Sequence, residues 1–84
     1  MGRPRLVYLT KPGCGLCDEA LPSLLRAARW LRCDVDVVDI AGDADLEAEY
    51  FLRIPVILDE RGTVLAEGPI GKRESLVAVM KTYR

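Results

Sequence analysis

The sequence predicts a single α/β domain whose elements follow in the order strand, helix, strand, helix, strand, strand, helix. Two observations carry this prediction: short apolar or β-branched runs alternate with segments of helical periodicity, and the chain opens on a strand, a helix and a second strand. Such an opening unit closes through a right-handed crossover onto a parallel partner, whereas a later hairpin adds antiparallel strands. We therefore expect a four-stranded mixed sheet flanked by helices, formed by one domain over residues 1–84.

The first half of the chain contains two predicted strands and the longest predicted helix. The run Leu6–Leu9 is uniformly apolar and precedes a turn-forming segment at 10–13, which predicts a strand covered on both faces. From Cys14 onward, apolar residues recur at helical spacing. These residues are Leu21, Leu24, Leu25, Ala28 and Leu31. The segment Cys33–Ile40 then alternates apolar and acidic residues at first and is rich in β-branched side chains, so it predicts a second strand.

The second half of the chain predicts a short helix, a hairpin and a closing helix. After a break at 41–43, Ala44–Phe51 contains good helix formers and predicts a helix of about two turns. Pro55 suits the first position of a strand over Val56–Leu58, and a four-residue turn at 59–62 leads into a strand over Thr63–Glu67. A second break at 68–71 separates this hairpin from a helix that starts at about Lys72.

Pro22 allows two interpretations of the first helix. If the helix starts at Cys14, Pro22 lies in its interior, where it removes a backbone donor and should kink the helix. If the helix instead starts near Asp18 or Glu19, Pro22 falls in the first turn and the preceding cysteines lie on a loop. The sequence leaves both starting points open.

Charge and hydropathy argue against nucleic acid and membranes as partners. The chain carries 12 basic and 13 acidic residues, a formal net charge of −1, and no apolar stretch long enough to span a bilayer. Arg3 and Arg5 form one basic cluster, and the series Arg26, Arg29 and Arg32 is expected to form the solvated side of a helix. We expect a cytoplasmic protein.

The cysteine and histidine counts exclude much catalytic chemistry. The chain has no histidine, which removes the commonest general base and the commonest zinc ligand. A Cys-His protease, a zinc hydrolase or a Ser-His-Asp esterase therefore cannot be assembled from these residues without unusual substitutes. Three cysteines are too few for a disulfide framework, and Cys33, at the start of a predicted strand, is expected to be a small buried hydrophobe.

The motif Cys14-Gly15-Leu16-Cys17 falls between the first predicted strand and the first predicted helix. In this context a Cys-x-x-Cys pair indicates a dithiol redox site. The spacing places both sulfurs on one helical turn, close enough to form a disulfide, and the unsatisfied N–H groups at the helix start favour the thiolate form of Cys14. We expect Cys14 to attack a substrate disulfide and Cys17 to resolve the mixed disulfide. Gly15 would allow close approach of a partner, and Leu16 would offer it apolar contact.

With the dithiol after a strand, Pro22 in the following helix and Ile54-Pro55 before a hairpin, the whole chain resembles the thioredoxin superfamily, and its size resembles a glutaredoxin. The resemblance implies the thioredoxin-like fold βαβαββα. It also implies that Pro55 is cis and lies beside the dithiol, with the Ile54 backbone binding substrate. Lys11 resembles the glutaredoxin lysine that holds the carboxylate of glutathione. In the first strand, Tyr8 occupies the place of the buried aspartate of thioredoxin.

The sequence thus predicts a glutaredoxin-like oxidoreductase that reduces protein disulfides or glutathione mixed disulfides. We expect a monomer with no tightly bound cofactor, reduced by glutathione or by a thioredoxin-type reductase system. One alternative is a thioredoxin-like module that holds a metal or an iron–sulfur cluster between two chains, with Cys14 as a ligand. Another is a redox-inert interaction domain that binds a peptide beside Ile54 and Pro55.

Overall fold

The computed structural model describes residues 2–83 of the chain. Seven main elements follow in the predicted order, with one additional 3₁₀ turn, η1. They are β1 (Arg5–Thr10), α1 (Gly15–Trp30), β2 (Asp34–Asp39), η1 (Ile40–Gly42), α2 (Ala44–Tyr50), β3 (Val56–Leu58), β4 (Val64–Glu67) and α3 (Lys72–Lys81). None of the helices within residues 2–83 combines the length and the apolar character that crossing a bilayer requires.

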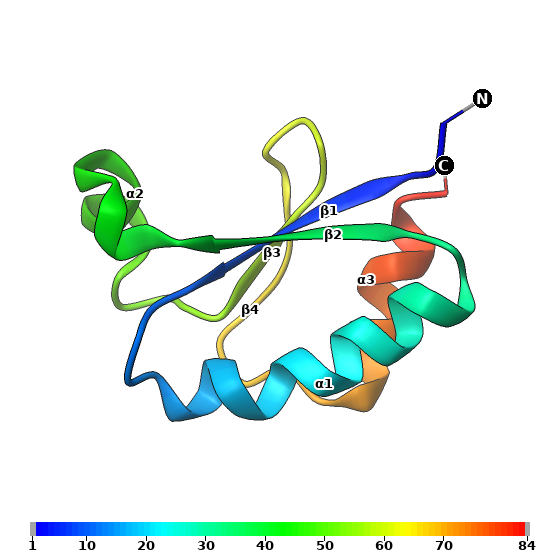
Figure 1. Cartoon of the computed structure of the whole chain (residues 1–84), viewed down its shortest axis with the longest axis horizontal. Helices are drawn as coiled ribbons and strands as arrows, with labels where there is room; N and C mark the ends of the chain where they lie inside the picture. The colour runs from blue at the N-terminus through cyan, green and yellow to red at the C-terminus, as the bar shows by residue number, and fades with distance from the viewer. Residues whose placement is uncertain (1, 84) are drawn as a thin grey trace.

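The four strands form one mixed sheet in the order β2-β1-β3-β4. β1 and β2 run parallel, joined by the α1 crossover, with Arg5 opposite Asp34 and Thr10 opposite Asp39. β3 lies antiparallel to β1 on its other side, with Leu9 opposite Val56. Because β3 starts where β1 ends, the segments after β1 and before β3 meet at the same edge of the sheet (Figure 1).

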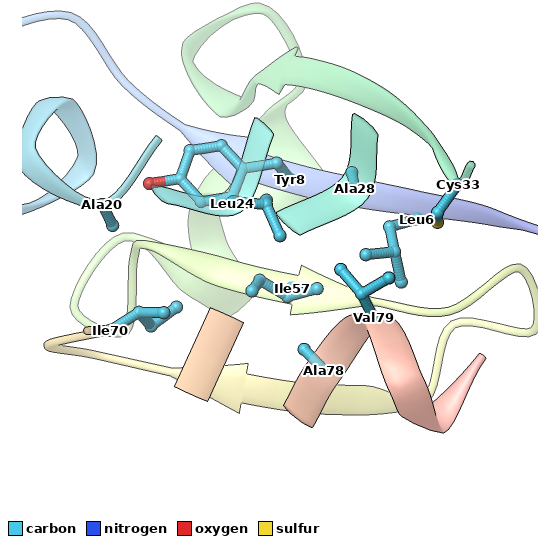
Figure 2. Packing of buried hydrophobic residues seen from close by; sticks show 10 residues of the cluster. All are labelled: Leu6, Tyr8, Ala20, Leu24, Ala28, Cys33, Ile57, Ile70, Ala78 and Val79. Atoms are coloured by element: carbon cyan, nitrogen blue, oxygen red, sulfur yellow. The ribbon is translucent and has the colours of Figure 1, made fainter. Parts of the chain in front are cut away.

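Helices cover both faces of the sheet, as the sequence predicts. α1 and α3 pack on one face, where the buried cluster includes Leu6 and Tyr8 from β1, Leu24 from α1 and Val79 from α3 (Figure 2). The opposite face carries a smaller cluster, which the η1 and α2 segment covers. Its buried members are Leu9, Ile40, Val56 and Leu58. Successive residues of β1 thus serve opposite cores, which explains why its sequence is apolar without alternation.

The helix α1 begins directly at the cysteine motif. Cys14 is its N-cap, and the helix runs without interruption through Pro22 to Trp30. The interpretation in which the helix starts near Asp18 or Glu19 is therefore wrong. The reason is that the first turn has its own cap, since the Cys14 sulfur accepts a hydrogen bond from the Cys17 N–H. A helix beginning there leaves the proline in its interior.

Two predicted strands are longer than those observed. Cys33 precedes β2, and Ile40 belongs to the turn η1, where the Asp39 carboxylate accepts a hydrogen bond from the Ala41 N–H at 2.8 Å. In the hairpin, Thr63 belongs to the turn because its N–H donates to the Asp59 carboxylate at 2.9 Å. Side chains that bond to the backbone compete with strand pairing, and here they end β2 before Ile40 and delay the start of β4 to Val64.

Candidate redox site

The loop after β1 delivers the cysteine motif to the edge of the sheet. Gly13 has a φ of 81°, a left-handed conformation that glycine adopts at the lowest cost. The turn it forms is closed by a hydrogen bond of 3.3 Å from the Cys14 N–H to the Lys11 carbonyl. Cys14 follows as the N-cap of α1, and both Gly15 and Leu16 are exposed on the first helical turn. The backbone thus presents the motif outward.

Cys14 and Cys17 form a disulfide across the first turn of α1, with their Cα atoms 5.2 Å apart. The two sulfurs differ in accessibility, because Cys14 is half-buried whereas Cys17 is only 1% exposed. The Cys17 N–H points at the Cys14 sulfur, with the nitrogen 3.1 Å from it. A donor in this position stabilises negative charge on the outer sulfur. The inner sulfur is out of reach of a bulky partner.

Tyr8 supports the turn that carries the dithiol from beneath. Its side chain is fully buried, and its hydroxyl donates a hydrogen bond of 2.7 Å to the carbonyl of Cys17. Figure 2 shows the ring beside Leu24, with the hydroxyl directed toward the Ala20 side of the cluster. Burial, and secondarily the negative charge of Asp18, raise the pKa of Tyr8 to about 12. The phenol is therefore a neutral donor at physiological pH.

Lys11 is held by an acidic residue on α2. Its ammonium group lies 2.7 Å from a carboxylate oxygen of Glu47, and both side chains are partly exposed. The sequence predicts a role for Lys11 beside the dithiol but gives no sign of this ion pair. The pair links the loop before α1 to the helix on the other face of the sheet, a contact between residues 36 positions apart.

Ile54 and Pro55 lie at the sheet edge where the dithiol loop leaves β1. The bond between them is cis, as the family resemblance implies. Because Leu9 pairs with Val56, the preceding proline falls beside the end of β1. The Ile54 N–H is already occupied by a bond of 3.1 Å to the Tyr50 carbonyl. Of the two backbone polar groups expected to bind substrate, only the Ile54 carbonyl thus remains.

Arg53 anchors the segment before the cis-proline. Its guanidinium pairs with Glu67 on β4 at 2.9 Å and with Glu49 on α2 at 3.0 Å, and it lies 4.9 Å from the centre of the Tyr50 ring. The Arg53 hydrogen bond holds the pKa of Glu67 below its usual range. The Gly68 N–H also donates to the Arg53 carbonyl at 3.1 Å. The contacts with Glu67 and Gly68 were not apparent from the sequence, since they join segments that are distant along the chain.

Cys33 lies apart from the dithiol. It is free, 4% exposed and packed in the cluster between the sheet and the helices α1 and α3. Burial raises the pKa of its thiol, which keeps the sulfur protonated and unreactive. This confirms the prediction that Cys33 is a small buried hydrophobe.

Comparison with protein families assigns the chain. Residues 5–79 match the model of the Glutaredoxin-like domain (DUF836), and the match covers β1 through most of α3. The chain belongs to this glutaredoxin-like family. The assignment includes the dithiol, Tyr8, Lys11 and the Ile54-Pro55 segment within the matched region.

Curated relatives of this family member are longer than the chain itself. It is 26% identical to the methylamine utilization protein MauD of Methylophilus methylotrophus over 106 aligned residues, which cover 99% of the chain and 50% of MauD. It is 35% identical to an uncharacterized protein of Mycobacterium bovis over 63 residues, or 69% of the chain and 65% of that protein. The chain therefore spans between half and two thirds of the length of these relatives.

Solved structures of other proteins share the fold of this chain. A Northeast Structural Genomics target protein from X. campestris aligns with a TM-score of 0.75 and 29% identity, over 90% of this chain and 96% of that one. Thioredoxin 1 from Thermosipho africanus aligns with a TM-score of 0.65 and 15% identity, over 94% and 92% of the two chains. The glutaredoxin-like chain thus has the thioredoxin fold, and its Cys14 and Cys17 form a disulfide at the start of α1.

Proposed function

We propose that the protein is a thiol–disulfide oxidoreductase that reduces disulfides of proteins or mixed disulfides with glutathione. The observation that carries this proposal is the asymmetry of the dithiol. Cys14 is accessible and receives the Cys17 N–H, whereas the sulfur of Cys17 is buried one turn further along α1. One thiol is therefore placed to attack an external partner, and the other is placed to attack only its neighbour.

The start of α1 provides the electrostatic part of the chemistry. The N-terminal N–H groups of a helix carry partial positive charge, and a thiolate at the N-cap interacts favourably with it. The Cys17 N–H gives the Cys14 sulfur one directed hydrogen bond in addition. Both effects favour the anion over the neutral thiol, and the thiolate is the form that attacks a disulfide.

The reaction starts from the reduced dithiol. The Cys14 thiolate attacks one sulfur of the partner's disulfide, which forms a mixed disulfide and releases the other partner sulfur as a thiolate. Cys17 then loses its proton to solvent and attacks the Cys14 sulfur, which releases the second partner thiolate. The dithiol has then given up two electrons and is the Cys14–Cys17 disulfide, while the partner has become a dithiol. The disulfide between Cys14 and Cys17 corresponds to the oxidised form that this reaction would produce.

Residues around the dithiol would position the partner. Leu16 is 46% exposed on the first turn of α1 and offers apolar contact, while Gly15 leaves room for a backbone. The carbonyl of Ile54, beside Pro55, is the polar group left for a partner's N–H, since its own N–H is bonded to the Tyr50 carbonyl. This surface suits an extended peptide that carries the target cysteine.

The electrons that restore the dithiol would come from glutathione or from a thioredoxin-type reductase. Lys11 is the residue expected to hold a glutathione carboxylate, but its ammonium is paired with Glu47. Binding of glutathione through Lys11 would therefore exchange one carboxylate partner for another. An exposed ion pair of this type contributes at most about 1 kcal/mol, so this exchange is energetically accessible.

The deciding experiment equilibrates the protein in graded mixtures of reduced and oxidised glutathione, followed by acid trapping, alkylation and intact mass measurement. We expect a two-electron transition confined to Cys14 and Cys17. Cys17→Ser should accumulate a mixed disulfide on Cys14, and Cys14→Ser should form none. Thiols that remain alkylatable throughout the range of cytosolic redox poise, with no adduct, would refute the proposal.

A further inference from the structure

A groove on the outer side of α1 and α3 gathers basic side chains around an exposed tryptophan. It has a volume of about 720 Å³ and lies between the C-terminal half of α1 and the start of α3. Trp30 is 80% exposed at its rim, and Leu76 of α3 contributes an apolar wall. The basic residues that line it are Arg26, Arg29, Arg32 and Lys72. We refer to this surface as the Trp30 groove.

The four cations of the Trp30 groove lack carboxylate partners within residues 2–83. The ion pairs within residues 2–83 are all formed by cations outside the groove, namely Arg3, Arg5, Lys11 and Arg53. The groove has no acidic residue in its lining. Since the protein has more acidic than basic residues, 13 against 12, the surface outside the groove is net negative. Positive charge is thus concentrated at one place.

The backbone conformation of Arg32 is a second sign that the positive charge of the groove has a role. Arg32 terminates α1 with a φ of 58°, the left-handed conformation for which helix ends usually use glycine. An arginine there is conformationally costly, and its backbone bonds, from its own N–H to the Arg29 carbonyl and from the Arg3 Nε to its carbonyl, do not require an arginine side chain. The backbone conformation therefore does not explain why an arginine, rather than glycine, stands at this position.

We propose that the Trp30 groove binds an acidic segment of a protein partner, one in which carboxylates alternate with apolar side chains. The carboxylates would pair with the groove arginines and Lys72, and the apolar side chains would cover Trp30 and Leu76. A nucleic acid fits less well, because a strand longer than the groove would run onto the net negative surface around it. A second copy fits less well because contact through its acidic α2 would be head-to-tail, whereas most homo-oligomers pair the same surface of both copies across a two-fold axis.

This site is separate from the dithiol. Trp30 follows Cys14 by the full length of α1, 16 residues, which places them about 24 Å apart along the helix axis. A partner held in the Trp30 groove would therefore leave Cys14 accessible. The inference goes beyond the proposed function and does not depend on it, because binding in the groove needs no thiol chemistry.

The test uses the fluorescence of Trp30, which is the only tryptophan of the chain. The probe is a short synthetic peptide in which pairs of glutamates alternate with leucine, and its control is the same peptide with glutamine. We expect the glutamate peptide to shift the emission to the blue in a saturable way, as an exposed indole becomes covered. Arg29→Glu should weaken this binding at least roughly tenfold, while Arg61→Glu, the same change in the hairpin turn, should not.

Two further variants separate binding from folding and from redox chemistry. Arg32→Gly removes one groove cation and suits the left-handed backbone, so it should fold normally yet bind the glutamate peptide several-fold more weakly. Cys14→Ser should bind it as wild type does, whether or not the protein proves to be an oxidoreductase. Equal binding of the glutamine peptide, or no blue shift, would overturn the proposal. Tighter binding of single-stranded oligothymidylate than of the glutamate peptide would also overturn it, in favour of a nucleic acid. A blue shift that depends on protein concentration without any peptide, together with dimers in sedimentation, would overturn it in favour of a second copy.

Discussion

Tyr8→Phe tests whether the buried phenol supports the turn that carries the dithiol. The substitution keeps the ring in the core and removes only the hydroxyl, which donates a hydrogen bond of 2.7 Å to the Cys17 carbonyl. A neutral buried hydrogen bond contributes about 1 kcal/mol net to the free energy of unfolding. For a domain of this size, that loss corresponds to a fall in Tm of about 4–8 °C. We expect this decrease in the oxidised protein at pH 7.

The high pKa of Tyr8 makes the same variant informative at alkaline pH. The phenol titrates near 10 in the unfolded chain and at about 12 in the folded protein. Below pH 10 both states are protonated, so the stabilisation is fully present. As pH rises from 10 to 12, the phenol of the unfolded state releases its proton first. The free energy of unfolding of the wild-type protein then falls by roughly 2 to 3 kcal/mol. Tyr8→Phe cannot lose this contribution.

The two effects oppose each other, so the difference between wild type and variant should change sign. The wild-type protein should have the higher free energy of unfolding at pH 7. The two values should be equal at about pH 11, and the variant should have the higher value above that pH. The assay is urea unfolding of both proteins at a series of pH values, with Tyr83→Phe as the control for loss of an exposed hydroxyl. A difference independent of pH would refute the assignment of a strongly raised pKa, and no difference at pH 7 would refute the hydrogen bond.

Four further predictions concern single sites. Gly13→Ala should lower the free energy of unfolding by about 1 kcal/mol in thermal melts through backbone strain alone, because no atom lies within 4 Å of the added Cβ; an unchanged Tm would contradict the φ of 81°. Arg32→Gly should leave that free energy unchanged or raise it by up to about 1 kcal/mol, and a decrease in urea unfolding would argue against the left-handed backbone. Glu47→Gln should release Lys11 and raise the rate of Cys14 alkylation at pH 7 roughly twofold, with Lys11→Met as the control that should not show the increase. Cys33 should resist alkylation in the native reduced protein and react only after unfolding, which mass spectrometry detects.

The sequence predicted the elements that depend on local pattern. The order of strands and helices, the two-sided burial of β1 and the position of the dithiol follow from periodicity and from turn residues, and the structure agrees. Element ends were less accurate where side chains bond to the backbone, as at Asp39 and Asp59. Such bonds depend on side-chain geometry, which composition and periodicity do not encode. The cis bond before Pro55 was predicted only from the family resemblance, because the trans form is the commoner one for any X-Pro pair.

The contacts that position the candidate site were the least predictable part. Tyr8 donates a hydrogen bond to the Cys17 carbonyl, nine residues further along the chain. Lys11 and Glu47 are 36 residues apart in sequence, and Arg53 and Glu67 are 14 residues apart. Each joins elements that are brought together only by the sheet order β2-β1-β3-β4 and the helices packed on it. A sequence pattern can locate the cysteine pair, because the Cys-x-x-Cys spacing is local, but not the partners that fix its surroundings.

The single helix α1 can serve two sites because its ends have opposite electrostatic character. Its N-terminus favours a thiolate at Cys14, and its C-terminus favours cations such as Arg29 in the last turn. The Debye length at physiological ionic strength is about 8 Å, so charges about 24 Å apart along the axis hardly affect each other. Charge reversal in the Trp30 groove should therefore leave the alkylation rate of Cys14 unchanged in Arg29→Glu at physiological salt. A changed rate would mean that the two ends are coupled through the structure of the helix itself, and the groove would then regulate the dithiol as well as bind a partner.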